Sequence, residues 1–108
     1  MRVLSVGLTA FAFLAAAPAK QTFTGRITDN MCARANHSSM KMGDTDGECA
    51  IACVHSHGAL YVLWDGKRSY ELSDQELPEQ YAGKRVAVTG TLDAKTGKLQ
   101  MSAIKAVK

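Results

Sequence analysis

The sequence predicts a mostly β domain, a five-stranded OB-type barrel, preceded by a cleaved export signal. Three observations lead to this prediction. Residues 1–19 have the composition of a secretory signal, five later segments have the residue pattern of strands, and turn-forming residues separate those segments. The chain is therefore expected to divide into a signal at residues 1–19 and a single OB-like domain at residues 20–108.

The predicted signal begins with one positive charge, Arg2, followed by a small or apolar run from Val3 to Ala17. It ends in Ala17-Pro18-Ala19, the kind of small-residue site that export peptidases cleave. The apolar run is too short to span a bilayer comfortably, and the sequence has no second run of this kind. We therefore expect cleavage after Ala19 and a secreted or periplasmic protein with no membrane anchor.

The strands of the expected barrel are five segments rich in β-branched and aromatic residues. The first alternates apolar and polar residues, with Phe23 and Ile27 on one face. Asp65-Gly66 favours a tight hairpin between the second and third strands, and Gly90 would permit a bulge in the fourth. The predicted strands are Thr22–Asp29, Ala59–Trp64, Arg68–Leu72, Lys84–Leu92 and Lys98–Val107.

Two short helices are expected between these strands. A long cysteine-rich polar loop over residues 30–47 follows the first strand, and a helix over Glu48–His57 follows the loop, with Asp46 as its N-cap. A second short helix begins at Ser73 or Asp74, between the third and fourth strands, where OB-type barrels place their helix. An irregular antiparallel sandwich of the same strands is the alternative architecture.

Charge and aromatic content argue against several functions. The formal net charge is +3, and basic and acidic residues are interspersed along the chain, so we expect no nucleic-acid partner. Tyr61, Trp64 and Tyr70 could form a stacking platform, but aromatic residues in paired strands are more often core contacts. The sequence has no paired carboxylates in an apolar setting and no Ser-His-Asp arrangement, so we do not expect an enzyme.

All three cysteines and all three histidines lie between residues 31 and 57. Export would place the cysteines where disulfide bonds form and persist. On a helix, Cys49 and Cys53 have Cβ atoms about 5–6 Å apart, whereas a disulfide needs a separation nearer to about 4 Å. The spacing therefore argues against a Cys49–Cys53 bond and favours a bridge from Cys32 to one of them.

A metal centre is the second interpretation of these residues. Cys32 and His37 from the loop, with Cys49 and Cys53 from the helix, would form a Cys₃His set that suits zinc. Thiolates near several methionines would also suit Cu(I), and His55 and His57 are reserve ligands. A redox protein with a reactive third thiol is a further alternative. The sequence thus predicts a binding or structural module stapled by cysteine chemistry, with an unknown small ligand or protein partner, or a periplasmic zinc- or copper-binding protein.

Four features of the expected mature chain are distinctive in combination. They are Thr24-Gly-Arg-Ile-Thr-Asp-Asn-Met-Cys32, His37, Cys49-Ala-Ile-Ala-Cys53 and Ala82-Gly-Lys-Arg-Val-Ala-Val-Thr-Gly90. Together they resemble an uncharacterised family of small secreted bacterial domains, and the likeness covers most of the mature chain. The resemblance implies export and an OB-like fold, and it implies no biochemical role.

Overall fold

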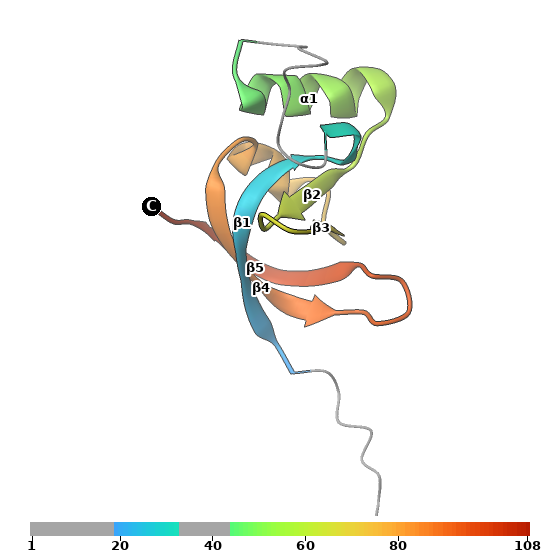
Figure 1. The fold of residues 1–108 in the computed structure, drawn as a ribbon, viewed down its shortest axis with the longest axis vertical. Helices are drawn as coiled ribbons and strands as arrows, with labels where there is room; N and C mark the ends of the chain where they lie inside the picture. The colour runs from blue at the N-terminus through green and yellow to red at the C-terminus, as the bar shows by residue number, and fades with distance from the viewer. Residues whose placement is uncertain (1–18, 33–43) are drawn as a thin grey trace, which may run out of the picture.

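The computed structural model describes residues 19–32 and 44–108, and Figure 1 shows their arrangement. Five strands, one α-helix and two 3₁₀ turns form in this part of the chain. In chain order they are β1 (Gln21–Asp29), η1 (Asn30–Cys32), α1 (Asp46–His57), β2 (Tyr61–Trp64), β3 (Ser69–Glu71), η2 (Leu77–Tyr81), β4 (Arg85–Leu92) and β5 (Leu99–Ala106).

The five strands form one antiparallel sheet in the order β3-β2-β1-β4-β5. The first strand of the sequence therefore lies at the centre of the sheet, between β2 and β4. The register of the β4–β5 pair shifts between Thr89 and Gly90, which confirms the predicted bulge. A Cβ atom on Gly90 would lie 2.2 Å from the carbonyl oxygen of Gln100, so only glycine fits this close strand approach.

Hydrogen bonds do not close the sheet into a barrel. In the described residues, its two edge strands meet at one isolated parallel bridge between Leu72 and Leu99. The amide of Ser73 donates to the Leu99 carbonyl at 3.0 Å, and the Ser73 hydroxyl accepts from the Met101 amide at 3.0 Å. Because β3 has only three residues, it is too short to pair along β5.

The helix α1 begins slightly earlier than the sequence predicted. Its N-cap is Thr45, whose hydroxyl accepts from the Glu48 amide at 3.1 Å, so the assignment of this role to Asp46 was wrong. Thr45 has extended backbone dihedral angles, as an N-cap requires, whereas Asp46 is already helical. Gly58, with φ of 68°, ends the helix in the left-handed region.

The region between β3 and β4 contains a 3₁₀ turn, η2, that starts at Leu77 rather than at Ser73 or Asp74. Ser73 is bound to β5, as described above, and lies outside the turn. The carboxylate of Asp74 accepts from the amides of Glu76 and Leu77 at 2.9 and 3.1 Å, the pattern of a side chain that starts a turn. The chain therefore turns at Asp74, after its last contact with β5 at Ser73, and the 3₁₀ turn itself covers Leu77–Tyr81.

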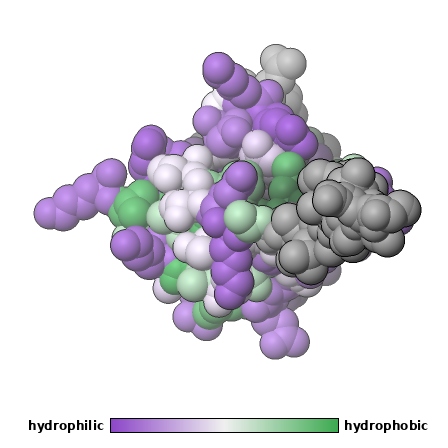
Figure 2. Space-filling model, turned by 90° about the horizontal axis from the view of Figure 1, so that it is seen from below, coloured by the Kyte–Doolittle hydropathy of each residue, from purple (hydrophilic) through white to green (hydrophobic). Residues whose placement is uncertain are grey.

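The hydrophobic core lies between the inner face of the sheet and α1, which crosses one end of the sheet (Figure 1). All five strand regions contribute to it, together with Ala50 of α1. Its buried members are Ile27, Ala50, Tyr61, Leu63, Tyr70, Leu72, Val86, Val88 and Leu99. On the face shown in Figure 2, hydrophobic residues form small areas separated by hydrophilic ones. Within the described ranges, no helix is long and apolar enough to cross a membrane.

Candidate functional site

Two of the four predicted metal or disulfide residues, Cys49 and Cys53, have described side chains. Both are buried, at 1% and 0% exposure, and they pack with Ala59 into a small cluster beside the main core. His37 lies outside the described residues, and only the backbone of Cys32, the last residue of η1, is described. The helix therefore places the two cysteines on one buried face, one turn apart.

The position of Cys32 follows from the hydrogen bonds of Asn30. The Asn30 amide donates to the Leu60 carbonyl at 2.9 Å, and the Leu60 amide donates to the Asn30 side-chain oxygen at 3.0 Å. These two bonds fix η1 beside Leu60, the residue after Ala59. Because Cys32 follows Asn30 by two residues, its Cα lies within about 7 Å of the Asn30 Cα. Cys32 therefore lies at the same end of the sheet as Cys49 and Cys53.

No disulfide bond joins Cys49 to Cys53, in agreement with the helical spacing. Among residues 19–32 and 44–108, no three cysteine, histidine or acidic side chains are grouped so that they could hold a metal ion. A complete Cys₃His set would require the Cys32 thiol and the His37 ring as well. The predicted metal site therefore stays a prediction.

A polar network connects the exposed side of α1 to the sheet. The Nε2 atom of His55 contacts the Oε1 atom of Glu79 in η2, which also accepts from the hydroxyl of Tyr61 at 2.6 Å. The side chain of Gln75 accepts from the Tyr61 amide at 2.7 Å and donates to the Tyr61 carbonyl at 3.0 Å. The network thus joins α1, β2 and η2, and it engages His55, one of the reserve metal ligands.

The charges of this network follow from burial and hydrogen bonding. Burial raises the pKa of Tyr61 above its ordinary value of 10, and the neighbouring Glu79 carboxylate raises it further. The Tyr61 hydroxyl and then the His55 ring lower the pKa of Glu79. At neutral pH, Glu79 is therefore an ionised acceptor and Tyr61 a neutral donor, an arrangement that fixes the helix rather than one that activates a nucleophile.

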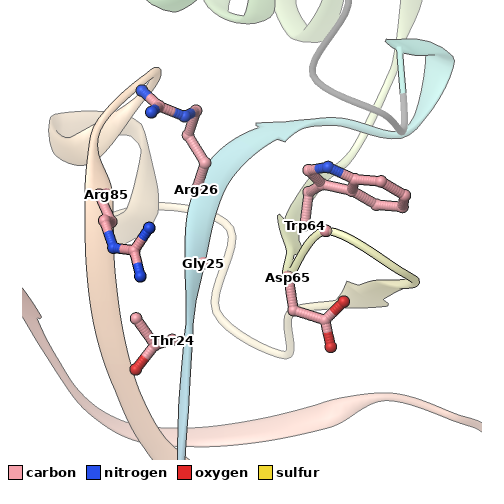
Figure 3. Close-up of a pocket in the computed structure, with 7 residues that line it drawn as sticks. Thr24, Gly25, Arg26, Trp64, Asp65 and Arg85 are labelled. Atoms are coloured by element: carbon pink, nitrogen blue, oxygen red, sulfur yellow. The ribbon is translucent and has the colours of Figure 1, made fainter.

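A hollow of about 170 Å³ opens between residues of β1, β4 and the end of β2, and none of its lining residues is a cysteine (Figure 3). Strand register places three of its side chains in one row, because Arg26 in β1 lies opposite Arg85 in β4 and opposite Trp64 in β2. Residues beside these three point into the core, so the row faces outward. The hollow is lined by Thr24, Gly25, Arg26, Trp64, Asp65, Gly66 and Arg85.

The three aromatic residues of the second and third strands do not form a stacking platform. Tyr61 and Tyr70 are buried in the core, whereas Trp64 is half-buried and lines the hollow. The two arginines beside Trp64 were not recognised from the sequence. The available signal was that Arg26 falls on the polar face of an alternating strand, but the alignment of Arg26 with Arg85 depends on pairing between distant strands.

No family model matches the chain, and neither the curated proteins nor the solved structures contain a significant match. The resemblance to small secreted bacterial domains therefore stays a prediction.

Proposed function

We propose that the chain is the precursor of a small exported OB-like binding module in which cysteine chemistry holds α1 against one end of the sheet. One observation carries the proposal. The buried cysteine face of α1 and the 3₁₀ turn that ends in Cys32 are both anchored at Ala59 and Leu60. A crosslink from Cys32 to Cys49 or Cys53 would join the start of the long loop to the helix that follows it.

The OB-like part of the proposal is supported by the strand order and by the contact between the sheet edges. The central strand β1 pairs on both sides, and the remaining edges approach each other at Leu72 and Leu99. The η2 turn occupies the position between β3 and β4 where an OB-type barrel has its helix. Such a sheet leaves the outer face of β1, β2 and β4 available to a ligand.

The export part of the proposal is supported by the position of β1. This strand begins at Gln21, so cleavage after Ala19 would remove none of the described secondary structure. N-terminal sequencing of exported material should give Lys20 as the first residue. A folded, exported product that retains Met1 would contradict the proposal, whereas a cut displaced by a few residues would not.

The crosslink is tested by intact mass spectrometry of the exported protein before and after alkylation under non-reducing conditions. The proposal predicts a mass lower by two hydrogen atoms and one alkylated thiol. Cys49→Ser and Cys53→Ser, measured in the same way, identify the partner of Cys32, because only the variant that lacks the partner regains the two hydrogen atoms. Three thiols that react at once, without a reductant or a chelator, would contradict the proposal.

A metal-binding function is the second candidate, and the adjacent thiols of Cys49 and Cys53 on one helix face favour it. The same alkylation experiment would then give three reactive thiols only after treatment with a chelator. Reduced, anaerobic protein should bind one equivalent of Zn²⁺ or Cu⁺, more weakly as the pH falls, because protons compete for the ligands. Cys49→Ser should abolish binding, whereas His55→Ala, which changes a residue bound to Glu79, should retain it.

A further inference from the structure

Two arginines occupy neighbouring positions on adjacent strands on the outer side of the sheet. Arg26 and Arg85 are directly opposite in the β1–β4 register, a position in which like charges destabilise a sheet. Neither arginine forms an ion pair with a carboxylate in the part of the chain that the structure describes. The described part of the chain therefore supplies no carboxylate partner for either guanidinium.

The two guanidinium groups differ in how they are held. One N–H of Arg26 donates to the Gly83 carbonyl at 2.9 Å, which fixes the side chain and leaves the rest of its donors for a ligand. In Figure 3 the guanidinium of Arg85 points toward β1, whereas that of Arg26 points away from it, in keeping with its hydrogen bond to Gly83 in the turn before β4. A planar carboxylate accepts paired hydrogen bonds from a guanidinium group. Two guanidinium groups on adjacent strands therefore suit a carboxylate ligand.

Trp64 lies on the other side of Arg26 in the same row. Gly66 has no side chain, and a Cβ atom there would meet no atom within 4 Å, so the hollow opens beside the indole. At Gly25 the Trp64 backbone itself comes close, since a Cβ atom on Gly25 would lie 2.3 Å from the Trp64 carbonyl oxygen. In Figure 3, the arginines lie on one side of Gly25, and Trp64 with Asp65 lies on the other. An indole beside charged groups provides an apolar surface for one face of a ring.

Asp65 determines which anions fit. The amides of Lys67 and Arg68 both donate to its Oδ1 atom at 2.8 Å, and these bonds lower the pKa of the carboxyl, which is therefore ionised. Its Oδ2 atom has only a long contact, 3.4 Å, with the Tyr70 hydroxyl and can accept from a ligand. The fixed negative charge of Asp65 disfavours a polyphosphate in the hollow. It favours a ligand whose hydroxyl groups lie next to the Asp65 carboxylate.

The volume limits the size of the bound group. At about 170 Å³ the hollow is smaller than the roughly 300–1,000 Å³ of sites that enclose a drug-sized molecule. It therefore suits a single ring, either a free monosaccharide or one unit of a longer chain.

We propose that this hollow binds a sugar ring that carries a carboxylate, with the carboxylate on Arg26 and Arg85, one ring face on Trp64 and hydroxyl groups toward Asp65. The inference rests on the proposed function only in that the module binds a ligand. A hexuronic acid, free or within an acidic polysaccharide, has this combination of groups.

The test uses the fluorescence of Trp64, the only tryptophan in the chain. Galacturonate should change the emission saturably, and galactose should bind at least about tenfold more weakly, because it lacks the group that the arginines recognise. Arg85→Gln should weaken galacturonate binding at least about tenfold. Lys95→Gln, the matched loss of one positive charge in the β4–β5 turn, should leave binding unchanged. A galacturonate trimer distinguishes the two sources, because a polysaccharide site binds it more tightly than the monomer.

Several results would overturn the inference. Equal affinity for galactose and galacturonate would remove the role of the arginines, and tighter binding of galactose 1-phosphate would replace the carboxylate by a phosphate. No change in Trp64 emission, and no shift of the Gly25 and Gly66 amide resonances in NMR spectra, would exclude a sugar site altogether. Circular dichroism of each variant checks that it is folded. The thiol measurements described above do not depend on any of these results, so the two proposals can fail separately.

Discussion

The backbones of Gly47, in the first turn of α1, and Gly83, in the turn before β4, are in direct contact. A Cβ atom on Gly83 would lie 2.7 Å from the Gly47 nitrogen, and one on Gly47 would lie 2.6 Å from the Ala82 carbonyl oxygen. The amide of Gly83 also donates to the Ile27 carbonyl at 2.8 Å. The first turn of α1 therefore packs directly against the turn that leads into β4.

Replacement of Gly83 by alanine should destabilise the protein strongly, because it combines a left-handed backbone, φ of 78°, with a backbone clash. Gly97→Ala is the matched control, since Gly97 has φ of 74° and a Cβ atom there would meet no atom within 4 Å. The free energy of unfolding of this control should fall by about 1–2 kcal/mol, from backbone strain alone. Urea unfolding should show a clearly larger loss of unfolding free energy for Gly83→Ala than for Gly97→Ala. Equal losses would show that the Gly47–Gly83 contact contributes nothing to stability.

Tyr61 should make the folded protein sensitive to alkali. Its pKa is raised in the folded state, so the stability that it contributes is complete below its ordinary value of 10 and is lost as the pH rises above that value. Tyr61→Phe should therefore show a flatter dependence of the unfolding free energy on pH above about pH 10. Urea titrations at pH 8 to 11 measure this slope, and identical slopes for the two proteins would contradict the assignment.

Asp65 and Asp93 should make the folded protein sensitive to acid, the opposite of the effect of Tyr61. Each carboxylate accepts from two backbone amides of its own turn, and these bonds lower both pKa values. Their contribution is therefore present above the ordinary value of 3.8 and is lost as the pH falls through the lowered folded-state values. The double variant Asp65→Asn/Asp93→Asn should lose less stability between pH 4 and pH 2 than the parent, as followed by thermal unfolding. Parallel curves would show that the two turns do not respond to acid.

Cys32→Ser should destabilise the protein if the proposed crosslink exists. A bond that closes a loop of about 15–20 residues contributes about 3 kcal/mol in the chain-entropy model. His37→Ala should have almost no effect under the disulfide interpretation, and it should lower the melting temperature as clearly as Cys32→Ser if a metal is the staple. Calorimetry of both variants under non-reducing conditions separates the two cases, and an unchanged melting temperature for Cys32→Ser would exclude both.

The five strands and the bulge at Gly90 could be predicted because they depend on local pattern. Alternation of apolar and polar residues marks the core face of β1, and Asp65-Gly66 marks the hairpin between β2 and β3. The bonds that hold Ser73 to β5, before the start of η2, could not be predicted, since they join segments far apart in the sequence.

The candidate sites were predictable in part for the same reason. The shared burial of Cys49 and Cys53 follows from their spacing on one helix. The pairing of Arg26 with Arg85, and of His55 with Glu79, depends on contacts between segments far apart in the sequence. Local pattern contains no information about such contacts, so the arginine row became visible only in the folded sheet.

The central position of β1 also has a consequence for the order of folding. Of the described strands β1 is synthesised first, but its longest pairing is with β4, the fourth of them. The sheet therefore cannot be completed until almost all of the domain has left the ribosome, and contacts of such long sequence separation form slowly. We expect β1 to stay unpaired with β4 during this interval, and the export proposed above would require a chain that has not yet folded.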